Sequence, residues 1–248
     1  MFNYGAFSPQ SGYLVVRLDK GSITGYAIIN AGIGKTNGFT GKRVDMIEQP
    51  GDRQPVAIFD FDGTITRKST TVPFLRFVFG TSVFIKAARQ LHALLLYHFN
   101  RMELDELNHI IARSFFTNLS RDYLFQQGKL FSDTVLPSLI RDSAYQRLRW
   151  HKSQGHYCIL ATAAYDLYMT HWSLCHAFNG LASTKIAFDE HNQATGTLEG
   201  KSCYGEEKLQ RVLQLIGHTP RTVYAYGDSS GDKAILDYAT HPYYKYFK

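Results

Sequence analysis

The chain has 248 residues, of which 44% are hydrophobic and 19% are charged, and its formal net charge is +6. This length and apolar content suffice for one domain, or for a core domain with an insert, and they favour a folded chain over a disordered one. The basic balance favours anionic partners such as phosphate esters, nucleic acid or acidic lipid, although scattered charge of this kind is also typical of a solvated surface.

Segments that would direct the chain across a membrane are not predicted. Cys158, Cys175 and Cys203 lack paired spacing, so the sequence predicts neither a disulfide framework nor a CxxC metal site, and a reducing cytoplasm fits best. No signal peptide is visible at the start. The longest apolar stretch, residues 83–99, is interrupted by Lys86 and other basic side chains.

Residues 1–52 differ from the rest of the chain, because they are rich in Gly, Asn and Thr. Two apolar runs, at 13–16 and 26–29, flank a turn-like DKGS at 19–22 and predict a loose hairpin. A disordered arm, or an upstream extension that the fold does not need, is the alternative. Met46 is an alternative start, since the globular pattern begins just after it.

A helical insert follows the first strand of the globular pattern. The run VAIF at 56–59 predicts a buried strand, and residues 70–153 predict several helices with short breaks. An insert of this length is larger than an ordinary connection. We therefore expect a small cap domain, residues 70–153, standing over the edge of a sheet.

Strands and helices alternate in the second half of the chain. The expected strands are residues 157–161, 184–188 and 222–226, and the expected helices are residues 165–177, 205–216 and a segment from 232. This alternation predicts a parallel sheet covered on both faces, formed by residues 53–69 and 154–248.

The first group of candidate functional residues is DFDGTIT at 60–66, at the end of the first strand. Asp60 and Asp62 can both face one site if the chain turns there, and Gly63 permits a tight turn. An acidic loop that caps a helix is the alternative interpretation.

The second and third groups carry a hydroxyl and an amine. Thr162 and Ala163 follow the expected strand 157–161, where a hydroxyl and free backbone N–H groups can hold a phosphate. Lys208 opens the helix 205–216, where an ammonium can neutralise a phosphate. Taken alone, each residue is equally typical of a helix cap or a helix surface.

The fourth group is GDSSGD at 227–232, directly after the expected strand 222–226. Asp228 and Asp232, four residues apart across a Gly/Ser turn, suit a hard cation with oxygen ligands, although a helix N-cap is the alternative. All four groups follow strand ends or open a helix near one. Since ligands bind outside the carboxyl ends of an open parallel sheet, the order of the four groups along the chain predicts that they form one site.

At these residues the sequence resembles the haloacid dehalogenase superfamily, from Val56 to the end of the chain. DFDGTIT is similar to its first motif, Thr162 to its second, Lys208 to its third and GDSSGD to its fourth. Phosphatase members of the superfamily carry a second acid at the position of Asp62, whereas the dehalogenases lack it, so in this respect the sequence resembles the phosphatases. The stretches 60–77, 148–168 and 203–208 are similar to the phosphoserine-phosphatase-like branch, subfamily IB, although Ala164 stands where relatives often have Ser.

The resemblance implies an α/β fold, with a Rossmann-like parallel sheet, helices on both faces and an inserted all-helical C1-type cap. It implies that Asp60 attacks phosphorus to form an aspartyl-phosphate and that Asp62 protonates the leaving oxygen and then activates water. Thr162 and Lys208 would hold the phosphate oxygens.

The resemblance also implies Mg²⁺ as the cofactor. Its ligands would be Asp60, the backbone carbonyl of Asp62, and Asp228, with Asp232 in support. A non-catalytic phosphate-binding module would lack one of these acids, and here all four are present.

The expected substrate is a small phosphorylated molecule of undefined identity. Arg67 follows the first motif, where phosphoserine phosphatases carry an acidic residue, so phosphoserine ranks below an unspecified phosphomonoester.

Two surface segments leave further partners open, and the sequence carries no signal for an oligomeric state. Residues 83–99 predict a basic amphipathic helix that either packs inside the cap or lies on anionic lipid. If the helix lies on lipid, a lipid phosphate such as phosphatidylglycerophosphate is a candidate substrate, and the protein would bind peripherally at the inner membrane surface. The alternating basic and aromatic residues 243–248 suit either nucleic acid or a packed terminal strand, and we expect the strand and no nucleic acid.

Overall fold

The computed structural model describes residues 13–20, 23–30, 50–51, 53–99 and 101–248, and the chain divides into two compact units, Met1–Gln49 and Pro50–Lys248. In the first unit, β1 (Tyr13–Lys20) and β2 (Ile23–Asn30) form an antiparallel hairpin with Tyr13 opposite Asn30. Met46, considered as an alternative start, lies outside the described residues.

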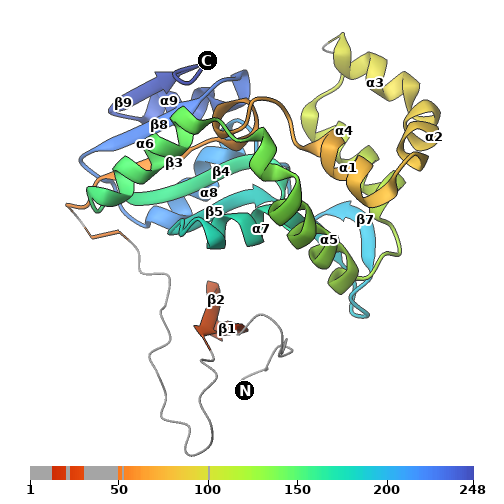
Figure 1. Cartoon of the computed structure of the whole chain (residues 1–248), viewed down its shortest axis with the longest axis horizontal. Coiled ribbons are helices and arrows are strands. Elements are labelled where there is room, and N and C mark those ends of the chain that lie inside the picture. The colour runs from red at the N-terminus through yellow and green to blue at the C-terminus, as the bar shows by residue number, and fades with distance from the viewer. Residues whose placement is uncertain (1–12, 21–22, 31–49, 52, 100) are drawn as a thin grey trace, which may run out of the picture. The chain divides into compact units, whose positions relative to one another are not determined.

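The second unit is built on a five-stranded parallel sheet (Figure 1). Its strands, in spatial order, are β5 (Gly180–Thr184), β4 (Tyr157–Tyr165), β3 (Val56–Phe59), β8 (Val223–Gly227) and β9 (His241–Tyr244). In the centre of the sheet, Val56 pairs with Tyr157 on one side and with Val223 on the other. The residues that follow β3, β4 and β8 therefore emerge side by side at one edge, as predicted.

Helices cover both faces of this sheet, which confirms the predicted α/β architecture. They are α6 (Asp142–Ser153), α7 (Asp166–Cys175), α8 (Glu206–Ile216) and α9 (Lys233–Tyr238). Ala57 and Phe59 of β3 join the apolar cluster that includes α6 and α7, whereas Val56 and Ile58 join the cluster that includes α8 and α9. Successive side chains of a strand point to opposite faces of the sheet, so a strand covered on both sides contributes alternate residues to two clusters. Helix α6 thus packs against the sheet, although the sequence places it at the end of the insert.

The remaining helices of the insert stand beside the sheet (Figure 1). They are α1 (Thr71–Phe79), α2 (Ser82–Arg89), α3 (Leu91–His98), α4 (Leu104–Ile111) and α5 (Arg121–Thr134). The helix expected over 83–99 is divided into α2 and α3, because the backbone leaves helical geometry at Gln90, with φ −106° and ψ 16°. Helix α5 packs closely on α7: a Cβ at Gly128 would lie 1.8 Å from the Leu167 carbonyl oxygen.

A second hairpin, β6 (Ile186–Phe188) with β7 (Ala194–Leu198), forms backbone hydrogen bonds with residues 118–121 of the insert. The expectation of one strand over 184–188 was therefore wrong, because Thr184 ends β5 in the parallel sheet whereas Ile186 pairs with Leu198 in the hairpin.

Candidate active site

The site begins where β3 ends. Asp60 is 5% exposed, and its N–H donates to the Tyr226 carbonyl of the neighbouring strand at 2.9 Å. The chain then turns through residues 61–65, where Gly63 adopts φ 83°. A Cβ at Gly63 would lie 2.5 Å from Oδ2 of Asp228, so this position requires glycine for both its backbone angle and its close approach. The turn therefore brings the first motif against the fourth.

A buried lysine joins the third motif to two acids. The Lys208 ammonium lies 2.9 Å from Oδ1 of Asp60 and 2.5 Å from Oδ1 of Asp232, and its side chain is 2% exposed. Burial alone would lower the pKa of Lys208, but the two carboxylates outweigh burial and raise that pKa well above its usual value. Lys208 is therefore charged, and α8 supplies a fixed cation at the edge of the sheet.

The loop after β8 is organised around Asp232. Its Oδ2 accepts hydrogen bonds from the N–H groups of Asp228 and Ser229, both at 3.0 Å, and from the Ser229 hydroxyl at 2.9 Å. Burial would raise the pKa of Asp232, but the neighbouring Lys208 outweighs it and lowers that pKa. Since both Asp232 oxygens are engaged, its main visible role is to fix the loop that presents Asp228.

Three carboxylates meet closely enough to hold a metal ion. One oxygen from each of Asp60, Asp228 and Asp232 can be chosen such that all lie within 4.8 Å of one another. An all-oxygen donor set of this kind fits a hard divalent cation such as Mg²⁺. The side chain of Asp62 is not among the three, and the role of its backbone carbonyl as a ligand stays a prediction.

The Asp62 carboxyl group faces the start of the insert instead. Its Oδ1 accepts hydrogen bonds from the Thr70 hydroxyl at 2.7 Å and from the Thr70 N–H at 3.1 Å. Burial raises the pKa of Asp62 to about 6, against the opposing effect of these bonds. Burial likewise raises the pKa of Asp60 to about 7, although Lys208 opposes this change. Of these two acids we take Asp60 as the ionised one, because its carboxylate faces the charged Lys208 ammonium.

The second motif lies in an irregularity of β4. The strand continues beyond its expected end, and its register with β5 shifts between Ala161 and Tyr165. Thr162 is fully buried there, and its hydroxyl accepts from the Ala164 N–H at 3.0 Å, whereas Ala163 is partly exposed. Bulges of this kind re-aim side chains next to sites, and the phosphate-binding roles of Thr162 and Ala163 stay predictions.

Arg67 does not join the carboxylates through any contact that the structure describes. Its guanidinium donates to the Ser138 carbonyl at 3.2 Å, and its N–H donates to the Leu139 carbonyl at 2.9 Å. These bonds tie Arg67 to the segment before α6. Its role in substrate binding stays a prediction without a supporting contact.

Three residues at the site were missed by the sequence reasoning. Thr70 holds Asp62, Tyr204 bonds the Ser230 hydroxyl at 2.8 Å, and the Lys248 ammonium lies 2.6 Å from Oδ2 of Asp228. Tyr204 is next to the third motif, which is the one signal that pointed to it. Thr70 lies eight residues after Asp62, whereas Lys248 reaches the site through tertiary structure alone.

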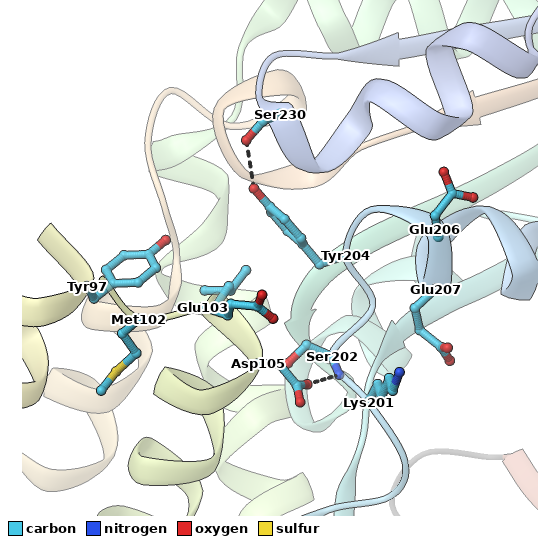
Figure 2. A pocket seen from close by; sticks show the side chains of 11 residues that line it. Tyr97, Met102, Glu103, Asp105, Lys201, Ser202, Tyr204, Glu206, Glu207 and Ser230 are labelled. Atoms are coloured by element: carbon cyan, nitrogen blue, oxygen red, sulfur yellow. Dashed lines mark hydrogen bonds between the residues drawn. The ribbon is translucent and has the colours of Figure 1, made fainter. Parts of the chain in front are cut away.

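A cavity of about 970 Å³ opens between the insert and the core, beside the fourth motif (Figure 2). Tyr97 and Met102 line it from the insert, and Tyr204 crosses it toward Ser230. Its charged lining residues are four acids and one lysine: Glu103, Asp105, Glu206, Glu207 and Lys201. Among the described residues, those that line the cavity include Ser230 of the fourth motif but none of the carboxylates that meet at Lys208.

Comparison with known proteins places this site in a family. A family model described as haloacid dehalogenase-like hydrolase matches residues 57–237. Protein CicA of Caulobacter vibrioides (strain NA1000 / CB15N) is 28% identical over 203 residues, which cover 82% of this chain and 91% of that protein.

Solved structures share the fold. A protein of unknown function from Bordetella pertussis Tohama I matches with a TM-score of 0.67 at 20% identity, over 77% of this chain and 89% of its own. A HAD family hydrolase from Salmonella enterica serovar Typhi matches with a TM-score of 0.58 at 12% identity, over 77% of this chain and 61% of its own. A phospho-aspartyl intermediate analogue of phosphoserine phosphatase gives 0.51 at 13% identity, over 76% and 84%.

Proposed function

Because the chain belongs to the haloacid dehalogenase-like hydrolase family, we propose that it is a magnesium-dependent phosphatase that hydrolyses phosphomonoesters through an aspartyl-phosphate. The observation that carries this proposal is the buried meeting of Asp60 with Lys208, beside Asp228 and Asp232. A nucleophilic carboxylate, a fixed cation and an oxygen-rich metal site are the groups that phosphoryl transfer needs.

In the proposed reaction, an oxygen of Asp60 attacks phosphorus, and the bond from phosphorus to the ester oxygen breaks. Asp62 donates its proton to the leaving oxygen, so an alcohol departs and an aspartyl-phosphate remains. Asp62 then takes a proton from water as the water oxygen attacks phosphorus. This step releases phosphate and restores the Asp60 carboxylate.

The neighbours of these two acids support their division of roles. Burial and the hydrogen bonds from Thr70 give Asp62 a pKa of about 6, so it can hold and release a proton near neutral pH. Lys208 holds Asp60 in place and neutralises part of the charge that the phosphate brings. Mg²⁺ held by Asp60 and Asp228 would shield the attacking carboxylate from the phosphate anion and stabilise charge on the phosphoryl oxygens.

A panel of phosphate esters tests the proposal on the parent protein, on Asp60→Asn and on Asp237→Asn. Asp237 is an exposed acid that pairs with Lys233 on α9, so its variant is a matched control. We expect turnover that requires Mg²⁺, a loss of at least about 10³-fold in Asp60→Asn, and no loss in the control. Equal hydrolysis by Asp60→Asn would refute the nucleophile.

A lipid phosphate is a second candidate substrate, favoured by apolar side chains that the insert leaves exposed. Phe84 is 60% exposed, Ile85 62% and Leu95 46%, on helices α2 and α3. Such side chains beside basic residues suit the surface of an anionic membrane. Among the described residues, no helix has the length and apolar character to cross a bilayer.

Flotation with vesicles that contain phosphatidylglycerol tests this candidate. We expect the parent protein to float, and the double variant Phe84→Ser/Ile85→Ser to stay in the dense fraction. Leu174→Ser removes a side chain of similar exposure, 46%, from α7 and should still float. A parent protein that remains in the dense fraction counts against a lipid substrate.

Phosphoserine is a third candidate, favoured by the acidic lining of the cavity. Glu103 and Glu206 are among the acids that line it, and carboxylates there can hold an ammonium group. The sequence ranked phosphoserine lower because Arg67 favours an anionic group on the substrate, but the Arg67 guanidinium donates to the Ser138 carbonyl instead. Including phosphoserine beside ammonium-free esters in the panel separates these substrates, and a higher kcat/KM for the ammonium-free esters would reject phosphoserine.

A further inference from the structure

Residues 245–248, here called the strap, fold back over the end of β8. The N–H of Lys245 donates to the Gly227 carbonyl at 2.8 Å, immediately before the metal-site loop. The ring of Phe247 stacks on Tyr226 with centroids 5.3 Å apart. The strap is thus held at its start by a backbone bond and in its middle by an aromatic contact.

A third anchor ties the strap to the first motif. The Arg141 guanidinium donates to the Phe247 carbonyl at 3.4 Å through Nη1 and to the Thr66 carbonyl at 3.1 Å through Nε. The backbone N–H of Arg141 also donates to the Ile65 carbonyl at 2.8 Å. One arginine therefore links the turn that carries the nucleophile to the strap.

These anchors place a second ammonium at the carboxylates. The Lys248 nitrogen lies 2.6 Å from Oδ2 of Asp228. Mg²⁺ coordinated by a carboxylate lies about 2.0–2.1 Å from its oxygen, so a cation on Oδ2 would occupy nearly the same space as this ammonium. Two cations so close repel each other strongly.

The two lysines of the site differ in burial, and this difference sets their roles. Lys208 is 2% exposed and bonds two acids, so it is a fixed part of the site. The side chain of Lys248 is 39% exposed and that of Asp228 is 14% exposed, so water can solvate the ammonium when it moves away. An ion pair of this exposure is weak and exchangeable.

We propose that Lys248 is a positioning residue of the metal site: its ammonium pairs with Asp228 and must leave Oδ2 before a divalent cation is held there. The inference rests on the proposed function, because it takes Asp228 as a metal ligand. Lys248 thereby lowers the affinity of the site for the cation, and it holds the Asp228 carboxylate in place until the cation arrives.

Direct titration with Mg²⁺ and with Mn²⁺ by calorimetry, without substrate, tests the inference. We expect Lys248→Gln to lower the Kd for the cation about two- to fivefold, the range that an exposed ion pair allows. Lys248→Arg keeps the charge and should stay near the parent value. Lys245→Gln removes the same charge from the same strap, but its amine lies over the Tyr244 ring at 4.9 Å, so its Kd should not change.

An unchanged or higher Kd in Lys248→Gln overturns the inference, as does an equal decrease in Lys245→Gln. Asp228→Asn in the same titration separates this failure from failure of the proposed function. If Asp228→Asn binds the cation as tightly as the parent, both the metal site and the inference fall. If Asp228→Asn loses the cation while Lys248→Gln matches the parent, only the role of Lys248 falls.

Discussion

Replacing Lys208 by Met should destabilise the protein, because this lysine compensates two buried acids. Removing one partner of a buried ion pair costs about 3–5 kcal/mol, since the remaining charge is left without compensation. Here burial already raises the pKa of Asp60 to about 7, so the released Asp60 can take up a proton near neutral pH at little cost. We therefore expect the lower end, about 3 kcal/mol at pH 7, or a decrease in Tm of about 6–12 °C for a unit of this size.

Urea unfolding at pH 7 and pH 5 measures this loss. The deficit should shrink at pH 5, because protonated acids no longer need the ammonium, and the double variant Lys208→Met/Asp60→Asn should recover part of it at pH 7. Lys129→Met is the matched control, since the Lys129 ion pair with Asp133 is exposed, and it should leave the urea midpoint unchanged. A Lys208→Met variant as stable as the parent would show that the buried pairs do not form.

Two further predictions concern buried residues of the core. Gly128→Ala would place a Cβ 1.8 Å from the Leu167 carbonyl oxygen, so it should lower the free energy of unfolding by about 2 kcal/mol, even after the gain in helix propensity. Gly51→Ala is the control, since a Cβ there meets nothing within 4 Å and should change stability little. Equal urea midpoints for the two variants would contradict the close contact at Gly128. Burial, with His156 as the second cause, lowers the pKa of His151 to about 3 from 6.5. The unfolded chain therefore takes up a proton that the folded protein does not bind, so the free energy of unfolding should fall as the pH drops from about 6.5 toward 3. A His151→Gln variant with the same pH dependence as the parent would exclude this contribution.

The catalytic edge of the sheet was predictable from the sequence because regular geometry does most of the placing. Asp60 and Asp228 directly follow strands that pair in parallel, so their side chains must emerge at the same edge. Lys208 lies in the first turn of α8, where the sequence predicted it. These contacts follow from local pattern and sheet register.

Other contacts depend on the path of the chain and left no local signal. Lys248 reaches Asp228 because the strap turns back at Lys245, where φ is 53°, an angle that nothing in the residue type predicts. The division of residues 184–188 into two strands depends on a change of partner, from β4 at Thr184 to β7 at Ile186. Arg67 could be placed near the motif, but its direction is decided by the carbonyl of Ser138.

The β6–β7 hairpin adds backbone hydrogen bonds to the contacts between the insert and the core, which include the packing of α5 on α7. Three backbone hydrogen bonds join residues 118–121 to residues 192–194, with lengths between 2.8 and 2.9 Å. A lid fastened only at its two chain connections can swing as one rigid body, but a swing of this insert would break these bonds. We therefore expect access to the cavity to depend on local movement of α3, whose Tyr97 lines it, and a crosslink between α3 and the core should slow product release without altering the proposed chemistry at Asp60.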